Sequence, residues 1–143
     1  QLKYLNLNSY VGYDVSPDAI KQCSVIFKDD NNKQFKLLKN YENTIADLTL
    51  SLDVIYHLIE DDIYNDYMLK LFESSHRYVI IYSSNNDKNE FNPPHVKNRA
   101  FSKWIKATKP EYKLIQHIPN KFPFNGDELN TSFADFYIFE LTA

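Results

Sequence analysis

An acidic residue at the end of an extended segment is the first feature of this sequence that could do chemistry. Asp14 ends the run Tyr10–Asp14, YVGYD, and a Ser-Pro pair begins a helical segment directly afterwards. A carboxylate at the end of a strand in a nucleotide-binding α/β sheet can accept hydrogen bonds from both hydroxyls of a ribose. We therefore interpret Asp14 as a nucleoside ligand; the alternative is a solvated loop aspartate that helps to cap the next helix.

A second acidic strand end carries a histidine shortly after it. The segment DLTLSLD ends at Asp53, and His57 follows four residues later. Histidine is the usual proton acceptor near neutral pH, so Asp53 and His57 are weak candidates for a catalytic base or for orienting groups. The alternative, which we favour, is that His57 satisfies backbone groups at a helix entry.

These residues are positioned by alternating extended and helical segments. The predicted strands cover residues 10–14, 35–38, 47–53, 78–83, 112–118 and 134–141, and the predicted helices cover 17–27, 61–75 and 96–108. Such alternation predicts an α/β fold with a mostly parallel, Rossmann-like sheet and helices on both faces. The last two strands have no helix between them, so we expect them to pair antiparallel at one edge of the sheet, with an antiparallel C-terminal strand. The carboxyl ends of the parallel strands should meet on one rim.

Composition limits the class of protein. The 143 residues carry a net charge of −3 and one cysteine, and 43% of them are hydrophobic, which suits a single domain spanning residues 1–143. No basic block favours nucleic acid, and no window approaches the ~20 apolar residues of a membrane span. The lone Cys23 favours a reducing, cytoplasmic compartment and core packing of its side chain. His76 and His117 lack the spacing of metal ligands, so we expect no metal.

Two longer stretches resemble a known family. The segments GYDVSPDAI and ADLTLSLDVIYHL resemble the second and fourth motifs of class I S-adenosylmethionine-dependent methyltransferases, and HVKNRAFSKWI and SFADFYIFEL resemble the helix and last strand of small bacterial members. The resemblance implies that Asp14 holds the cofactor ribose and that Leu52 and Asp53 line its methionine end. The cofactor-binding residues it implies are Asp14, Val15, Asn40, Tyr41, Leu52 and Asp53. Asn40 and Tyr41 would contact the adenine, with a plain loop as the equal alternative.

The glycine-rich first motif of that family has no counterpart here. The chain holds two glycines, Gly12 and Gly126, and neither stands in such a loop. We expect the first strand and its loop to precede Gln1, which makes this an N-terminally truncated domain. Leu2–Leu7 would then be the tail of a helix. Gly12 leaves space either for close packing or for approach of a cofactor.

Three functions follow from these patterns. The first is methyl transfer from S-adenosylmethionine to a small-molecule acceptor, with nucleic acid and membrane disfavoured as partners. The second is a non-catalytic, methyltransferase-like interaction or regulatory module, because the glycine loop is missing. The third is a nicotinamide-dependent dehydrogenase, which the expected antiparallel strand disfavours. Acceptor specificity should lie in the loops Ser83–Pro94 and Pro119–Ser132, in addition to any upstream residues.

Overall fold

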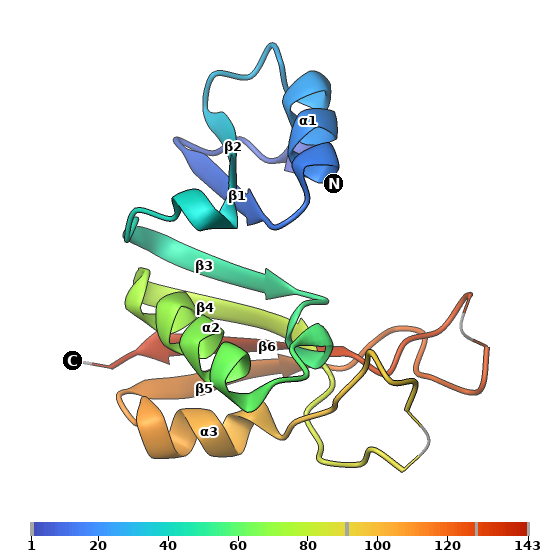
Figure 1. Cartoon of the computed structure of the whole chain (residues 1–143). Helices are drawn as coiled ribbons and strands as arrows, with labels where there is room; N and C mark the ends of the chain where they lie inside the picture. The colour runs from blue at the N-terminus through green and yellow to red at the C-terminus, as the bar shows by residue number, and fades with distance from the viewer. Residues whose placement is uncertain (1, 91, 128, 143) are drawn as a thin grey trace. The chain divides into compact units, whose positions relative to one another are not determined.

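The chain divides into two compact units. A computed structural model describes residues 2–90, 92–127 and 129–142. The first unit is Gln1–Thr44 and the second is Ile45–Ala143. Both units are drawn in Figure 1.

The first unit is a strand–helix–strand unit with two parallel strands. Strand β1 (Tyr10–Asp14) pairs with β2 (Lys33–Leu37) in a register that sets Asp14 opposite Leu37. Helix α1 (Pro17–Ile26) joins them; Ser16 accepts a hydrogen bond from the Ala19 N–H, and Pro17 needs no partner at the first helical position. The Ser-Pro signal thus places the helix start as expected.

The ends of this unit differ from the expectation. A 3-10 turn, η2 (Leu38–Asn40), follows β2. The predicted helix tail over residues 2–7 is wrong: only a 3-10 turn, η1 (Leu2–Tyr4), is present there. One isolated turn without further intrahelical hydrogen bonds does not propagate into a helix.

The first unit is thinly packed. Its interior is a set of ring contacts in which Phe35 lies 5.3 Å from Phe27 and 5.9 Å from Tyr10, centroid to centroid. None of its described apolar residues is fully buried. The buried residue among those described is Lys33, whose ammonium donates a hydrogen bond to the Leu5 carbonyl at 3.3 Å. This unit therefore has no hydrophobic core of the kind found in the second unit.

The second unit is a four-stranded mixed sheet in the order β3-β4-β6-β5. Its elements, in chain order, are β3 (Ala46–Leu52), η3 (Ile55–His57), α2 (Asp61–Glu73), β4 (Ser75–Ser83), α3 (Phe101–Thr108), β5 (Tyr112–Ile118) and β6 (Asp135–Leu141). β3 and β4 are parallel, whereas β6 is antiparallel to both β4 and β5. The expected antiparallel C-terminal strand is confirmed, which counts against the dehydrogenase hypothesis.

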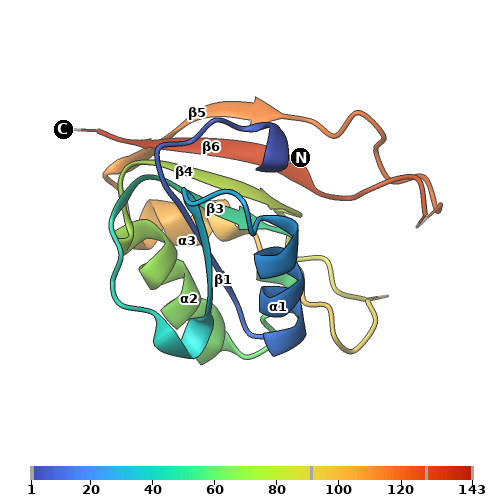
Figure 2. The same ribbon diagram turned by 90° about the horizontal axis from the view of Figure 1, so that it is seen from above.

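Helices α2 and α3 lie on the same face of this sheet (Figure 2). The core fills the space between that face and the two helices. Its buried apolar members are Ile55, Tyr64, Met68, Leu71, Phe72, Val79, Ile81, Phe101, Ile105, Tyr112 and Phe139. Strand β4 supplies the centre of this core through the buried Val79 and Ile81, whereas the alternate apolar residues Tyr78, Ile80 and Tyr82 are only half-buried.

Strand β3 turns its polar side toward the helices. Ser51 is buried and accepts a hydrogen bond from the Tyr67 hydroxyl at 2.8 Å, and the Thr49 hydroxyl donates to the Leu71 carbonyl at 2.9 Å. The alternate side chains Leu48, Leu50 and Leu52 are 40–48% exposed. Hydroxyls can face this helix because each finds a partner there, which removes the cost of burying them.

Two expectations change in detail. The strands form two sheets rather than one, because β1 has β2 as its hydrogen-bonded neighbour and β3 has β4. The predicted helix over residues 96–108 begins only at Phe101. Backbone groups just before it bond to side chains of the preceding loop instead: Asn98 N–H donates to Asn89 at 2.7 Å and Ala100 N–H to Asp87 at 2.8 Å.

Candidate functional site: two strand ends

Asp14 lies exposed at the carboxyl end of β1. Its Oδ1 accepts a hydrogen bond from the Ser16 N–H at 2.7 Å, and Ser16 in turn caps α1. Both interpretations of Asp14 from the sequence are therefore compatible with the structure, because one carboxylate oxygen shapes the turn while the group stays open to solvent. Val15 follows with 78% of its side chain exposed.

The segment after β2 lies at the same end of the two-stranded sheet. Because Asp14 is in register with Leu37, the residues that follow each strand emerge side by side. Tyr41 is half-buried, with its ring edge-on to the Tyr13 ring at 5.4 Å, and the Tyr13 and Thr44 hydroxyls are 3.0 Å apart. Asn40, the last residue of η2, is exposed. The first unit thus brings Asp14, Val15, Asn40 and Tyr41 to one end.

Gly12 serves packing within this unit. A Cβ built at Gly12 would lie 3.0 Å from Cδ1 of Phe35 and 3.1 Å from Cε1 of Tyr10. Such contacts are shorter than van der Waals distance, so a side chain here would push the two rings apart. Of the two roles open for Gly12 in the sequence, the structure supports close packing.

The end of β3 has an unusual backbone at Asp53. Asp53 has a φ of +58°, which lies in the left-handed region, and its N–H donates to the Tyr82 carbonyl at 3.0 Å. Aspartate is one of the few residues with a side chain that tolerates this region. The preceding Leu52 is 48% exposed. A sharp turn therefore follows the strand and leaves both Leu52 and Asp53 accessible.

Tyr56 connects the two weak catalytic candidates. Its hydroxyl donates to Oδ1 of Asp53 at 2.7 Å, and its ring lies 4.5 Å from the His57 ring. Burial, and then the hydrogen bond to Asp53, raise the pKa of the Tyr56 phenol far above its ordinary value. Tyr56 therefore stays protonated as a donor, and it is Tyr56, not His57, that engages the Asp53 carboxylate.

His57 and Arg99 have different surroundings. Nδ1 of His57 lies 3.3 Å from the His95 carbonyl oxygen, and the two imidazole rings are stacked with centroids 6.1 Å apart. Arg99 is buried and donates to the carbonyls of Leu58 and Ile59 and to Asp61. The Arg99 guanidinium therefore holds the backbone that leads into α2.

Three aromatic residues near this strand end are absent from the sequence-based site. Phe133 packs edge-on against Tyr56 at 5.4 Å, and Phe124 packs against Phe133 at 6.3 Å. The available signals were the tyrosine within DVIYHL and Phe124 within KFPFN, a segment of the loop already linked to acceptor specificity; Phe133 directly follows that loop.

Among the residues that the structure describes, there is no candidate metal site and no candidate membrane-spanning helix. Within residues 2–90, 92–127 and 129–142, no three His, Cys, Asp or Glu side chains group closely enough to hold an ion. Within the same ranges, no helix has both the length and the apolar character for crossing a bilayer.

Solved methyltransferase structures share this fold. No family model and no curated protein matches the chain by sequence. The methyltransferase domain of bacterial CtHen1-C aligns with a TM-score of 0.67 and 17% identity, over 95% of this chain and 78% of that one. N-methyltransferase NodS from Bradyrhizobium japonicum aligns with a TM-score of 0.71 and 14% identity, over 94% and 74%.

A third similar structure was solved with cofactor bound. Magnesium protoporphyrin IX methyltransferase from Synechocystis, with bound S-adenosylmethionine, aligns with a TM-score of 0.63 and 12% identity, over 92% of this chain and 59% of that one. Likeness at such low identity concerns the fold, since one fold hosts many functions. The chain has the fold of class I S-adenosylmethionine-dependent methyltransferases.

Proposed function

We propose that this protein binds S-adenosylmethionine and transfers its methyl group to a small-molecule acceptor. One observation supports this above the others: Asp14 lies exposed at the carboxyl end of β1, in register with the end of β2. In open α/β sheets a carboxylate in that place binds ribose hydroxyls. Bound S-adenosylmethionine supplies an activated methyl group on a sulfonium sulfur.

The residues of the two strand ends fit the cofactor by chemistry. Asp14 would accept the ribose hydroxyls, and the exposed Val15 and the half-buried Tyr41 offer apolar surface to adenine. Leu52 and Asp53 would contact the methionine end, as the resemblance implies. Each of these groups is accessible within its own unit.

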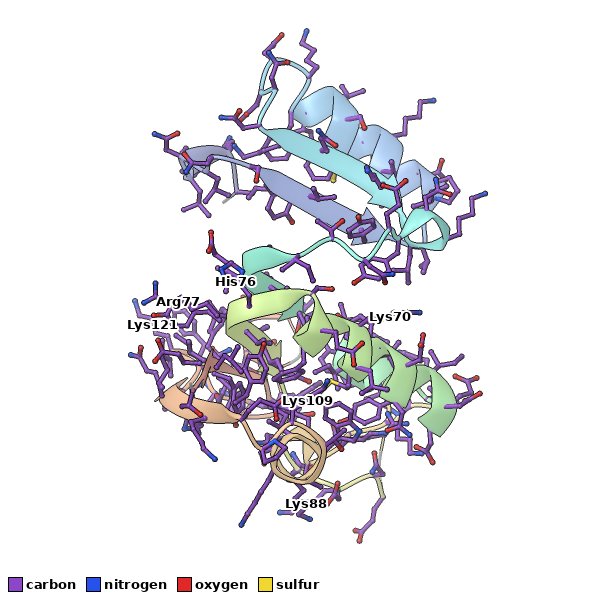
Figure 3. All side chains as sticks on the ribbon, turned by 90° about the vertical axis from the view of Figure 1, so that its left-hand side faces the viewer. Lys70, His76, Arg77, Lys88, Lys109 and Lys121 are labelled. Atoms are coloured by element: carbon purple, nitrogen blue, oxygen red, sulfur yellow. The ribbon has the colours of Figure 1, made fainter. Side chains whose placement is uncertain are left out.

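Charge supports a small acceptor over nucleic acid. Figure 3 labels basic side chains from several parts of the chain, of which His76 and Arg77 are neighbours on β4. Four of them are paired with acidic groups: Lys70 with Asp66, His76 with Asp47, Arg77 with Glu140 and Lys109 with Glu73. A surface that binds phosphates needs basic groups gathered and available. The chain also has a net charge of −3.

Calorimetric titration with S-adenosylhomocysteine tests this function, using the full-length gene product. Asp14→Asn keeps an oxygen that can accept from the Ser16 N–H but removes the charge that would bind two hydroxyls. We expect binding to weaken at least about tenfold, because hydrogen bonds to charged groups contribute about 1.5–3 kcal/mol each. Asp18→Asn, the same change at an aspartate in the first turn of α1, is the control and should leave binding unchanged.

A non-catalytic module is the second candidate, and the glycines favour it. Gly12 is used for packing, and Gly126 lies in the loop before β6 with a φ of +102°. Absence of any S-adenosylhomocysteine binding, or equal binding by both aspartate variants, would support this candidate instead.

A further inference from the structure

An Asn-Gly pair stands in the loop between β5 and β6. Asn125 is followed by Gly126, and no other asparagine of the 143 residues precedes a glycine. Both residues are exposed. A Cβ built at Gly126 would meet no described atom within 4 Å. The main chain around this pair is therefore open to solvent and free of neighbours that would hinder chemistry on it.

The side chain of Asn125 folds back along its own main chain. Its Oδ1 accepts hydrogen bonds from the Asp127 N–H at 3.1 Å and from the Thr131 hydroxyl at 3.5 Å. The first of these bonds closes a ring of atoms that includes both Cγ of Asn125 and the nitrogen of Gly126. The turn therefore limits how far Cγ can move away from that nitrogen.

The N–H of Gly126 is available for reaction. Within residues 2–90, 92–127 and 129–142, no group accepts a hydrogen bond from it. An amide nitrogen attacks a carbonyl only after it has lost its proton, and a paired, buried N–H would resist that loss. Glycine helps further, because it has no Cβ to crowd the attack and adopts a wide range of backbone angles.

We propose that Asn125 is a site of spontaneous deamidation, whose isoaspartate product loosens this loop. The Gly126 nitrogen gives its proton to solvent and forms a bond to Cγ of Asn125, which closes a five-membered succinimide. The side-chain nitrogen takes up a proton and leaves as ammonia. Water then opens the ring at either carbonyl and leaves aspartate or isoaspartate. The sum is asparagine plus water to one of these acids plus ammonia, so the reaction requires only solvent.

The hydrogen bonds to Oδ1 favour the ring closure. Negative charge develops on Oδ1 as Cγ becomes tetrahedral, and donors that already point at that oxygen stabilise the charge. The Asp127 N–H is such a donor, and the Thr131 hydroxyl is a second, longer one. The inference is independent of the proposed function, since it involves neither a cofactor nor a methyl acceptor.

The reaction changes the loop in two ways. Either product adds a carboxylate two residues before Asp127, whose own oxygens already accept from the Leu129 N–H at 2.9 Å and the Asn130 amide at 2.8 Å. Isoaspartate also lengthens the main chain by one carbon directly after Phe124, whose N–H donates to the Ser132 carbonyl at 2.9 Å. We expect this hydrogen bond across the loop to weaken.

Peptide mapping by mass spectrometry tests the site on the folded protein. The protein is incubated in a mildly alkaline buffer made in ordinary water or in ¹⁸O-labelled water, and is then digested at low pH, where the reaction stops. We expect the peptide that contains Asn125 to gain about one mass unit in ordinary water and about three in labelled water, because one solvent oxygen replaces the amide nitrogen. The product should separate into two isomers on reversed-phase chromatography.

Asn130 is the internal control, and Asn125→Gln is the matched variant. Asn130 is exposed in the same loop but precedes the β-branched Thr131, so fragment ions should show its mass unchanged. Glutamine keeps the amide but would have to close a six-membered ring, which is slower, so Asn125→Gln should lose the acidic product. Urea unfolding followed by fluorescence of Trp104 on α3 verifies that this variant folds.

Three results would overturn the inference. Product that forms in urea but not in the folded protein would mean that the fold protects Asn125. Equal product at Asn125 and Asn130 would remove the role of Gly126. The third result concerns the loop: the isoaspartate fraction, separated by anion exchange, should exchange the amide hydrogens of Phe124 and Ser132 for deuterium faster than unmodified protein does. Equal exchange rates would remove the predicted loosening.

Discussion

The backbone at Asp53 yields a stability prediction with a definite order of variants. Its φ of +58° disfavours any residue with a Cβ except aspartate and asparagine, and its carboxylate accepts from the Tyr56 hydroxyl. Asp53→Asn keeps both tolerance of this backbone and an acceptor oxygen. Asp53→Gly loses the acceptor but is free of strain, and Asp53→Ala loses the acceptor and is strained.

The difference between glycine and alanine isolates the backbone contribution. A Cβ in the left-handed region costs about 1–2 kcal/mol. Glycine costs about 0.4–1 kcal/mol more than alanine through the greater freedom of its unfolded chain. The balance leaves Asp53→Gly about 0.5–1 kcal/mol more stable than Asp53→Ala. We expect the order native, then Asn close to it, then Gly, then Ala.

Urea unfolding monitored by Trp104 measures this order in the second unit. Trp104 donates to Asn65 at 2.8 Å and contacts the Phe72 and Tyr64 rings, so its fluorescence reports on the core. With a slope of about 1–2 kcal/mol per molar urea, the two variants should differ in midpoint by about 0.5 M. An alanine variant as stable as the glycine variant, or more stable, would refute the strain at Asp53.

Two further predictions concern the same unit. Tyr112→Phe removes a buried hydroxyl that donates to the carbonyls of Phe72 at 3.1 Å and Ser75 at 2.7 Å, so urea unfolding should show a loss of about 1–3 kcal/mol; an unchanged midpoint would contradict this. Hydrogen bonds from Lys97 and then from Arg99 lower the pKa of Asp61 to about 2. The native protein should therefore have a higher free energy of unfolding than Asp61→Asn. This difference should be complete above the ordinary carboxyl pKa and disappear as pH falls from about 4 to about 2. A difference in unfolding free energy that stays constant over this range would exclude the effect.

Local signals in the sequence were enough to predict most of the elements. Ser16 and Pro17 set the start of α1, and the predicted strand over residues 112–118 coincides with β5. Asp14 was placed at a strand end for the same reason: an extended run meets a helix-starting pair. The antiparallel last strand followed from the missing helix between the final two runs.

Features that depend on contacts between residues distant in the sequence could not be predicted from local patterns. The alternation of β3 does not tell which side meets α2, because Ser51 becomes suitable for burial only through Tyr67, sixteen residues away. The late start of α3 depends on loop side chains that take over the backbone groups before Phe101. The ring contacts of Phe133 with Tyr56 and of His57 with His95 join η3, the segment before α3 and the loop after β5, which no periodicity relates.

The exposed leucines of β3 affect how this protein should be handled in the laboratory. Leu48, Leu50 and Leu52 form an apolar row on the folded chain, with 40–48% of each side chain exposed. Environment-sensitive dyes such as ANS bind apolar surface whether or not a protein is unfolded. A dye-based melting curve of this protein would therefore start from a bright folded baseline and understate its cooperativity. Intrinsic fluorescence of Trp104 avoids that error.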